Sequence, residues 1–571
     1  MQCQEKYGGN HLMRPPGQTL ESLTIGPLPI VNHFLDQLKL RELFCQMLPS
    51  RPGRRPILPC ADALCVLVRN MLLSRYPLYS IPDWTRTFVP ELLGIPPNQI
   101  DLLNDDRIGR CLDLFFASDR ATFLTLFLTR MIKIFNLELD VLHNDSTSIM
   151  FTGRYPRCNP AALWITNGHS KDHRPDLKQL IFELTVTEDG AVPILVALHN
   201  GNVTDDQTHR QTWDRLRKLV GRPDFIYVAD CKLCVSDTMT SITRNGGHFV
   251  TVLPATRKEE KWFKEWIQTH PVSWEEVWKR PAVRRKNDPP DVFQGFESPL
   301  PSAEGFRILW YHSSAKHQRD QEYRQTRIRR TIVDLEFLNS RTGAYKLKTD
   351  EQVQRAAEKI VQDLGTKQWI EVTVVSTEKV EYQQACPGRP GLQTPYRQVK
   401  KARPQVKWRV RDEVVAWDAK TDGLFPLITD VGKDRADLKQ VLLWYKYQPH
   451  LEKRFEQLKT VFNVRPVFLK KVERVESFLV LYFITLIVEA LIERQLRRGM
   501  KMAGVAELPL YPEQRLCKAP TAERILELFG GLRRHRLLQG GKEVARFQDK
   551  LPTSGTEVLD LLGVNREAFS E

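Results

Sequence analysis

Three acidic residues that lie far apart in the sequence have the types and positions needed for metal-dependent chemistry. Asp145 ends the strand-like run ELDVLHND, Asp230 ends the short buried run PDFIYVAD, and Glu452 lies in a segment with helical periodicity. Three carboxylates at short range repel one another, so we expect a cation to share them. Oxygen-only ligands suit Mg²⁺ or Mn²⁺, and two such ions, typically ~3.5–4 Å apart, activate a water or 3′-hydroxyl at a phosphodiester.

Asp145 alone has a simpler explanation, because a carboxylate that follows a strand often caps a turn or a helix. The segment around Glu452, YKYQPHLEKRFEQLK, has such an explanation too: its polar side chains are those of a solvated helix face. The offsets of 0, 3, 7 and 14 put four polar residues on one helical face: Tyr445, Gln448, Glu452 and Lys459. The three acids taken together favour the metal site.

Pro449 interrupts that helical segment. Proline is unfavourable in the middle of a helix but suits its first turn. We therefore expect the helix to start at Pro449, with Tyr445 and Gln448 just before it.

The elements around the first two acids alternate in a regular way. From residue 137 the pattern predicts strand, strand, strand, helix, strand, helix and strand, with a hairpin turn at Glu188-Asp189-Gly190. The first three strands are compatible with an antiparallel meander, and the later strands are added through helical crossovers. The result is an α/β fold with a mixed sheet and helices on its faces. Asp145 and Asp230 are expected at strand ends, where active sites of α/β sheets lie.

The segments outside this sheet have other patterns. Residues 20–130 and 438–496 are helical in periodicity, and the tail 501–571 is expected to form small helical pieces and loops. Residues 256–425 interrupt the alternation and hold eight of the twelve tryptophans. We interpret them as an inserted subdomain with sheet and helix. Within it, QVKWRVRDEVVAW is expected to be a strand.

The charge balance favours a polyanionic partner. The chain of 571 residues has 84 Lys+Arg against 69 Asp+Glu, a formal charge of +15. Nucleic acid is the simplest such partner, although a soluble basic protein has the same composition. Residues 316–330 carry six Lys/Arg and residues 389–411 carry eight with no acid. These two stretches suit phosphate contact, or equally a solvated face or linker.

No feature predicts a membrane or a secretory route. The first 15 residues lack an apolar signal region, and the run FLVLYFITLIV (478–488) is shorter than the roughly 20 residues that a membrane span needs. We expect it to be a buried helix. The ten cysteines are scattered, which favours buried thiols in a reducing cytoplasm.

The ordered motifs resemble the bacterial insertion-sequence transposases of the DDE type, which have an RNase H-like core. LHNDSTS resembles the first-Asp motif and FIYVADCKLCVSD the second. The third resembles the signature Tyr-x2-Arg-x3-Glu-x6-Lys, with Gln448 in place of the arginine. GHSKDHRPDLKQL, GNVTDDQTH, DGLFPLITD and RPVFLKKVERVESFLVLYFITL are further stretches of this kind, although Phe478 stands where a histidine is expected.

The resemblance implies a domain plan: a flexible N-terminus (1–19), a helical N-terminal domain for DNA-end binding or dimerisation (20–130), an RNase H-like core (137–255 and 426–500), the insertion (256–425) and the tail (501–571). It implies cleavage at the ends of an insertion sequence and strand transfer into target DNA, with Asp145, Asp230 and Glu452 holding two Mg²⁺ or Mn²⁺ ions. Its partners would be terminal inverted repeats, target DNA and a second copy in a synaptic homodimer, in the nucleoid-associated cytoplasm of a bacterium. The residues expected to contact DNA are Tyr445, Gln448, Lys459, Arg327, Arg329, Arg330, Lys400, Lys401 and Arg403.

Two other functions stay open at this stage. A decayed or repurposed copy would bind DNA on the same fold without catalysis, and the loss of the arginine at Gln448 favours it. A structure-directed nuclease on the same core would cut DNA without joining strands.

Overall fold

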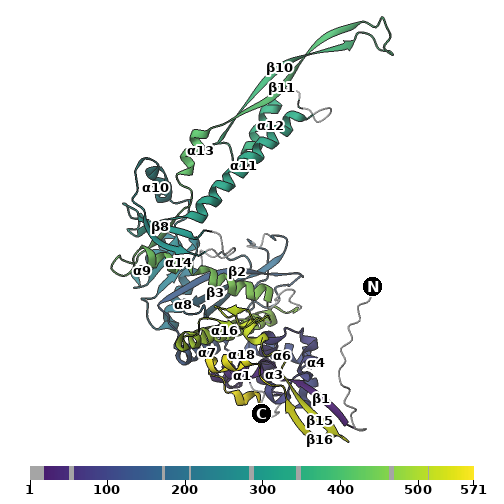
Figure 1. Ribbon diagram of the computed structural model, residues 1–571, viewed down its shortest axis with the longest axis vertical. Helices are drawn as coiled ribbons and strands as arrows, with labels where there is room; N and C mark the ends of the chain where they lie inside the picture. The colour runs from purple at the N-terminus through teal and green to yellow at the C-terminus, as the bar shows by residue number, and fades with distance from the viewer. Residues whose placement is uncertain are drawn as a thin grey trace. The chain divides into compact units, whose positions relative to one another are not determined.

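The computed structural model describes residues 18–49, 57–169, 174–204, 208–281, 289–341, 347, 349–461, 469–511 and 513–570. The chain forms two compact units, Met1–Val250 with Leu443–Glu571 (unit 1) and Thr251–Leu442 (unit 2) (Figure 1). All three candidate acids belong to unit 1. Most of the predicted flexible N-terminus lies outside the described residues.

A mixed sheet forms the centre of unit 1. Its strands lie in the order β4-β3-β2-β5-β6. The β2, β3 and β4 strands form an antiparallel meander, and β5 and β6 continue the sheet in parallel on the other side of β2. This arrangement confirms the predicted α/β fold with its mixed sheet and flanking helices. The bounds are β2 Val141–Phe151, β3 Lys178–Thr187, β4 Pro193–Asn200, β5 Ile226–Val228 and β6 His248–Val252.

The prediction that Asp145 ends its strand is wrong. The β2 strand runs on to Phe151, so Asp145 lies in its interior. The cause is an asymmetry between the neighbours of β2: the long β3 strand pairs with it from Leu142 to Phe151, whereas β5 pairs with it only as far as His143. Asp145 is therefore the second residue beyond the end of the parallel pairing.

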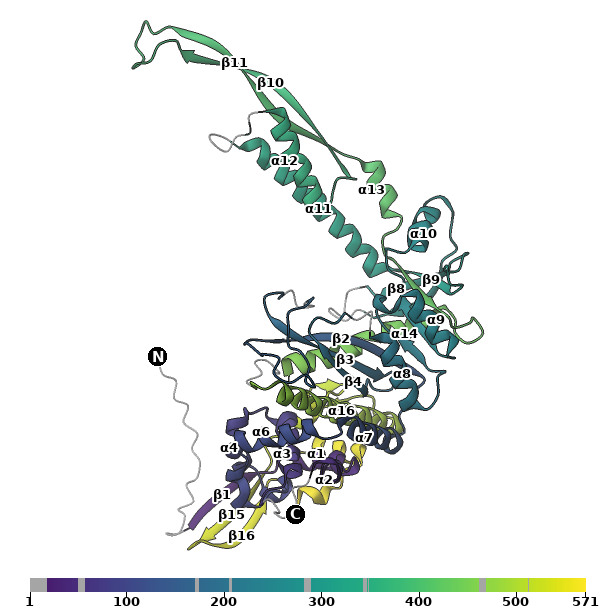
Figure 2. The same ribbon diagram turned by 180° about the vertical axis from the view of Figure 1, so that it is seen from behind.

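Helices cover both faces of this sheet. The α15 helix (Gln448–Glu456) packs on β2 and β3, and the long α16 helix (Val472–Ala503) packs on β4. Figure 2 shows α16 between the strands and the N-terminal helices. Of these helices, α3 (Cys60–Leu73) and α6 (Asp105–Ala117) contact α16 directly. The remaining α-helices of unit 1 are α1 Leu28–Gln37, α2 Leu40–Met47, α4 Ile81–Arg86, α5 Pro90–Leu93, α7 Arg120–Phe135, α8 His209–Val220, α9 Ser236–Arg244, α17 Ala522–Glu527 and α18 Thr553–Leu562. The α14 helix (Leu438–Lys446) begins in unit 2 and ends in unit 1.

The α16 helix contains the apolar run that was expected to be buried. By length and composition it is the one helix among the described residues that could cross a membrane, but 94% of its most apolar window is buried inside the protein. The helix is apolar because it packs on the sheet from one side and on helices from the other. The expectation of a buried helix is confirmed.

The two ends of unit 1 meet in a small antiparallel sheet. The β1 strand (Gln18–Thr24) pairs along its whole length with β15 (Arg533–Gln539), which also pairs with β16 (Lys542–Gln548). The tail therefore contains strands, including the short pair β13 (Leu508–Pro509) and β14 (Leu516–Cys517), and is not made only of helical pieces and loops. Glycines at 540 and 541, both with positive φ, form the turn between β15 and β16.

Unit 2 contains both strands and helices. Four strands lie in the order β12-β9-β8-β7, and a separate pair of long strands forms a ribbon. The strand bounds are β7 Glu275–Arg280, β8 Asp291–Glu297, β9 Arg307–Ser313, β10 Ile370–Gln384, β11 Tyr396–Val410 and β12 Leu424–Thr429. The helix bounds are α10 Lys258–Thr269, α11 Ser314–Ser340, α12 Asp350–Asp363 and α13 Asp412–Ala419.

The α13 helix corrects one prediction. The run QVKWRVRDEVVAW was expected to be one strand, but the strand ends at Val410 and a helix begins at Asp412. Asp412 and Glu413 fall in the first turn of that helix, where acidic side chains interact favourably with its dipole.

Candidate active site

The pairing of β2 with β5 brings the first two candidate acids to the same level. The two strands are parallel, with His143 opposite Val228 as the last pair. Continuing this register by two residues puts Asp145 level with Asp230. Since neighbouring strands lie about 4.8 Å apart, two residues at the same level of parallel strands are close in space.

The face of the sheet that Asp145 points to follows from its neighbours. Asn144 donates to Glu183 (3.1 Å) and Thr185 (2.9 Å) on the face that α8 covers. His143 lies on the opposite face, where its ring packs at 4.8 Å from the ring of Tyr447. Because successive side chains alternate, Asp145 shares the face of His143. This is the face on which α15, the helix of Glu452, is packed.

His143, two residues before Asp145 on the same face of the sheet, is excluded from solvent. Its side chain is fully enclosed, and burial together with the nearby His450 lowers its pKa to about 3. Neither ring nitrogen has a hydrogen-bond partner among the described residues. The ring is therefore neutral near pH 7 and packs as part of the core.

The two aspartates make local hydrogen bonds of ordinary kinds. Asp145 accepts a hydrogen bond from the backbone N–H of Ser146 (2.7 Å). Asp230 caps the short helical turn Cys231–Leu233 by accepting from the N–H of Lys232 (3.0 Å), and 44% of its side chain is exposed. The capping role is thus present at Asp230, and it leaves an exposed carboxylate beyond the end of β5.

The signature segment spans three elements. Tyr445 lies at the end of α14, Gln448 is the first residue of α15, and Lys459 lies in the π-helical turn Gln457–Val461. As predicted, Pro449 sits in the first turn of a new helix and Tyr445 precedes it, but Gln448 is already helical. The expected single helical face is therefore broken at Tyr447.

Tyr445 links the second and third acids. Its pKa is raised, first by burial and then by the negative charges of Asp230, Cys231 and Glu452. Carboxylates raise the pKa of a phenol only at short range, because the phenolate is repelled by them. Asp230, which follows β5, and Glu452, on α15, thus both act electrostatically on the Tyr445 hydroxyl.

These acids suit a hard cation by their donor chemistry, since carboxylate oxygens are the ligands of Mg²⁺ and Mn²⁺. Among the described residues, however, no group of three or more His, Cys, Asp or Glu side chains is arranged to hold a metal ion. The register of β2 and β5, continued by two residues, brings Asp145 level with Asp230. Asp230 and Glu452 are related only through their common effect on Tyr445. That Asp145, Asp230 and Glu452 bind a common metal ion stays a prediction.

Arg454 fixes α15 in place, and the sequence patterns did not single it out. Its buried guanidinium donates to the carbonyls of Ala191 (3.1 Å) and Gly190 (3.2 Å), at the turn between β3 and β4. It also pairs with the buried carboxylate of Glu493 on α16 at 2.9 Å. The helix of Glu452 is therefore tied to the sheet and to the central helix two residues from the acid.

A buried polar network lies behind the aspartates, on the α8 face. Glu183 accepts hydrogen bonds from His199 (2.7 Å), Thr212 (2.6 Å) and Asn144. Burial pushes the pKa of Glu183 up, but the hydrogen bonds from His199 and Thr212 and the charges of His199 and His209 hold it below its ordinary value. Glu183 is therefore an ionised carboxylate that fixes β2, β4 and α8 to β3.

His209 extends from this side toward Asp230. Its Nδ1 lies 3.0 Å from the Tyr227 hydroxyl, and its Nε2 lies 4.0 Å from Asp230 Oδ1. His209 belongs to the stretch GNVTDDQTH, which was noted in the sequence without a role. The sequence marked His209 only as a histidine within a motif-like stretch. Its contacts could not be predicted, because Tyr227 and Asp230 come from a later part of the chain.

Gln448 is anchored less well than its neighbours. The carbonyl oxygen of its side chain is buried and accepts no hydrogen bond from the described residues. An arginine, which is expected here from the signature, has no acceptor atom and would leave no such oxygen.

The other predicted DNA contacts lie in unit 2. Arg327 on α11 donates to the carbonyl of Leu364 (2.6 Å) and packs over Trp369, so it has a packing role. Arg329 and Arg330 are exposed on the same helix. On β11, Lys400 pairs with Glu378 at 3.1 Å, while Arg403 has no acidic partner in the described part of the chain. The side chain of Lys401 lies outside what the structure describes.

Comparison with known proteins finds a matching family model and similar solved structures. A family described as "Domain of unknown function (DUF4277)" matches residues 20–128. Among solved structures, the chain is similar to the piggyBac transposase in a synaptic complex with hairpin DNA, with 14% sequence identity and a TM-score of 0.26. The match covers 50% of this chain and 59% of that chain, less than two thirds of its length. No curated protein matches the chain.

Proposed function

We propose that this chain is a DDE-type DNA transposase of an insertion sequence, which cleaves phosphodiesters at the ends of its element and joins them to target DNA. The observation that carries the proposal is the parallel register of β2 and β5, which ends at His143 opposite Val228 and, continued by two residues, would bring Asp145 level with Asp230. The negative charges of Asp230 and Glu452, which both raise the pKa of Tyr445, support the same grouping. The choice of DNA cleavage and strand transfer as the reaction comes from the resemblance of the ordered sequence motifs to DDE-type transposases.

Asp145, Asp230 and Glu452 would hold two Mg²⁺ or Mn²⁺ ions. Ions bound there supply Lewis acidity and a strong oxygen nucleophile for attack on phosphorus. Tyr445, Gln448 and Lys459 would contact the DNA backbone near the cut, with Lys459 as a point charge on phosphate. Arg454 would act as a positioning residue, because it holds α15 without reaching the acids.

The wider setting is part of the same proposal. The partners would be the terminal inverted repeats, read by the helical N-terminal domain, and target DNA, with a homodimer bringing two ends together. The net charge of +15 supports a polyanionic partner. The bacterial cytoplasm, in association with the nucleoid, would be the place of action.

A second candidate, a DNA-binding protein without catalysis, has one observation in its favour. Gln448 takes the place of a permanent cation and has a buried oxygen with no hydrogen bond in the described chain. Such a protein would bind element ends and leave them intact.

Excision from a donor plasmid in Mg²⁺ separates the two candidates. The plasmid carries the coding region with its natural flanking DNA, and wild type is compared with Asp230→Ala. We expect excision by wild type and at least a hundredfold loss in the variant, because removal of a catalytic carboxylate removes an ion ligand. End binding, measured separately, should stay within a few-fold of wild type.

Asp237→Ala is the matched control, since Asp237 is an exposed acid in the first turn of α9, close to Asp230 in sequence. It should excise like wild type. Absence of excision in both wild type and Asp230→Ala, with end binding retained, would favour the second candidate. Cutting without joining would favour a nuclease.

A further inference from the structure

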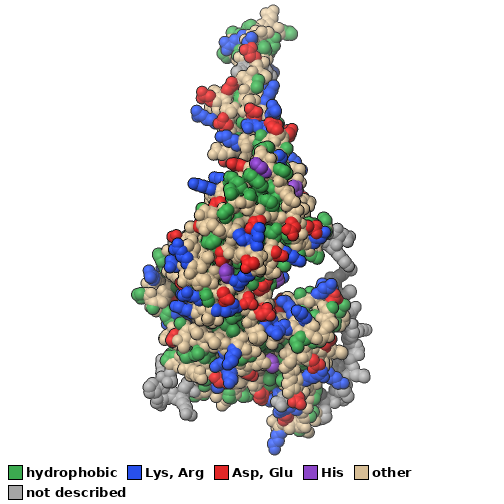
Figure 3. Space-filling model, turned by 90° about the vertical axis from the view of Figure 1, so that its left-hand side faces the viewer, with side chains coloured by type: hydrophobic (Ala, Val, Ile, Leu, Met, Phe, Trp, Pro, Cys, Tyr) green, Lys and Arg blue, Asp and Glu red, His purple; other side chains and the backbone are tan. Residues whose placement is uncertain are grey.

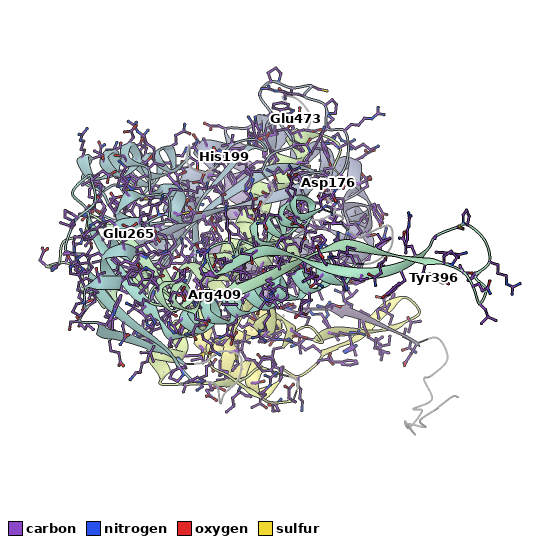
Figure 4. The ribbon with its side chains drawn as sticks, turned by 90° about the horizontal axis from the view of Figure 1, so that it is seen from above. Asp176, His199, Glu265, Tyr396, Arg409 and Glu473 are labelled. Carbon is purple, nitrogen blue, oxygen red and sulfur yellow. The ribbon has the colours of Figure 1, made fainter. Side chains whose placement is uncertain are left out.

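A long two-stranded ribbon is the most exposed feature of unit 2. The β10 and β11 strands pair through fifteen antiparallel residue pairs, from Ile370 opposite Val410 to Gln384 opposite Tyr396. Figure 4 shows Tyr396 toward the free end of the ribbon and Arg409 nearer its base. Neither strand pairs with any other strand in the described chain.

The base of the ribbon is braced by a hydrophobic core of its own. Ile370 and Val406 are buried against α11 and α12, and Val372, Val374 and Trp408 pack on the same cluster. All these residues are even-numbered, so they share one face of the ribbon. We call it the even face, and the opposite one the odd face. The brace fixes the orientation of the odd face, which points away from α11 and α12.

Beyond this core, polar groups on the even face are paired within the chain. Lys400 forms an ion pair with Glu378 (3.1 Å), and Gln398 donates to the hydroxyl of Tyr382 (2.7 Å). Ser376 donates to Asp350 at the start of α12. These groups would have to give up their partners to bind a ligand.

The odd face has cations without such partners. Arg397, Arg403 and Lys407 lie on β11 at odd positions, opposite Gln383, Thr377 and Thr373. None of the three forms an ion pair with an acid in the described part of the chain, whereas Arg409, further toward the base, lies 3.9 Å from Glu413. Figure 3 shows Lys and Arg side chains at intervals along the part formed by α11, α12 and the ribbon.

The spacing of these cations matches an extended polyanion. At about 3.4 Å per residue, the ten steps from Arg397 to Lys407 cover roughly 34 Å, about the length of one turn of duplex DNA. The major groove is also wide enough to admit a two-stranded ribbon. The residues directly opposite the three cations are uncharged, and the one acid between them on this face is Glu381, opposite Val399.

We propose that the ribbon is a DNA-binding arm that contacts duplex DNA with its odd face through Arg397, Arg403 and Lys407. The proposal rests on the proposed function for its choice of a nucleic-acid partner. It moves the contact away from Lys400, which belongs to the even face and is paired with Glu378. Binding through phosphates is independent of sequence, so the arm adds affinity without selecting a site.

The test is the salt dependence of binding of the full chain to a labelled 40-base-pair duplex of arbitrary sequence, followed by fluorescence anisotropy. R397Q/R403Q/K407Q is compared with wild type. Each lost phosphate contact lowers the slope of log K against log salt concentration by about 0.9. We expect the slope to fall by about 2–3 and the affinity at low salt to fall at least tenfold.

A charge-matched control removes three exposed cations elsewhere in unit 2, in the variant K261Q/R355Q/K359Q. It should change the slope by less than one, and K400Q should behave like this control. Equal slopes for wild type and the odd-face variant, or equal losses in the two triple variants, would overturn the proposal. If the odd-face variant is a monomer where wild type is a dimer, and the salt slope of DNA binding is unchanged, the odd face contacts a second copy of the chain. That result too would overturn the proposal.

The outcome separates this proposal from the proposed function. The binding assay needs no cleavage and is repeated with Asp145→Asn, which should keep the wild-type slope. If the ribbon effect is found but no excision occurs, the arm stands and the transposase proposal fails. If excision occurs but the slope does not depend on the odd face, only the arm is wrong.

Discussion

Glu489 is a carboxylic acid enclosed on all sides in the middle of α16. A guanidinium nitrogen of Arg75 lies 4.0 Å from one of its oxygens, and its other oxygen has no hydrogen-bond partner among the described residues. Burial and the neighbouring Glu493 raise its pKa to about 8. Glu489 is therefore protonated near neutral pH. The neighbouring Glu493 has Arg454 as its partner.

The raised pKa of Glu489 predicts a pH dependence of stability. Between the ordinary value of 4.5 and about 8, the unfolded chain loses this proton and the folded chain keeps it. The free energy of unfolding should thus fall with rising pH across this window, by on the order of 1 kcal/mol per pH unit. Glu489→Gln has no such proton, so its stability relative to wild type should increase from about pH 5 to about pH 8. Urea unfolding followed by tryptophan fluorescence measures this, and parallel curves for both proteins would contradict it.

Single residues also show where sequence reasoning reached its limit. The types of Asp145, Asp230 and Glu452 pointed to one site, and the register of β2 with β5 agrees with the pairing of the first two. The roles of Arg454 and His209 were not predictable, because their partners come from distant segments and no local pattern marks a buried ion pair. Asp145 was misplaced within its strand because the length of β5 is not visible from β2.

At the scale of elements, α15 depends on one buried ion pair for its position. Arg454→Met should destabilise unit 1 by about 3–5 kcal/mol, because Glu493 would stay buried without its main partner. The double variant R454M/E493L should recover much of that loss. Lys453→Met, on the exposed side of the same helix, should change stability by only about 0.5 kcal/mol. Chemical unfolding measures all three, and a loss in R454M no larger than in K453M would rule out the anchoring role.

Elements with strong periodicity were predicted well and paired elements less well. The order of strands and helices from 137 to 255 followed from alternating and helical patterns, and so did the buried α16. Only the part of the ribbon near its base was predicted as a strand. Beyond the base, its exposed strands are rich in polar residues and do not alternate between apolar and polar side chains. The β1–β15 pairing joins residues more than 500 positions apart and has no local signal.

At the scale of the whole molecule, that pairing predicts the effect of truncation. A chain that starts at Ile25 lacks β1 and exposes the edge of β15 along seven residues. We expect Tm to fall by about 5 °C and self-association to increase, because an unpaired strand edge is a template for another chain. A chain that starts at Gln18 keeps β1 and is the control. Differential scanning fluorimetry and light scattering measure both effects, and identical results for the two chains would contradict the expectation.

The central claim is that Asp145, Asp230 and Glu452 form one site for divalent cations. Its most direct test is Mn²⁺ binding to the full chain with duplex DNA present, followed by the loss of the EPR signal of free Mn²⁺. We predict two ions per chain in wild type that are absent in D145N/D230N/E452Q, whose DNA binding and thermal unfolding should match wild type. Superimposable Mn²⁺ titrations of the two proteins would contradict the claim.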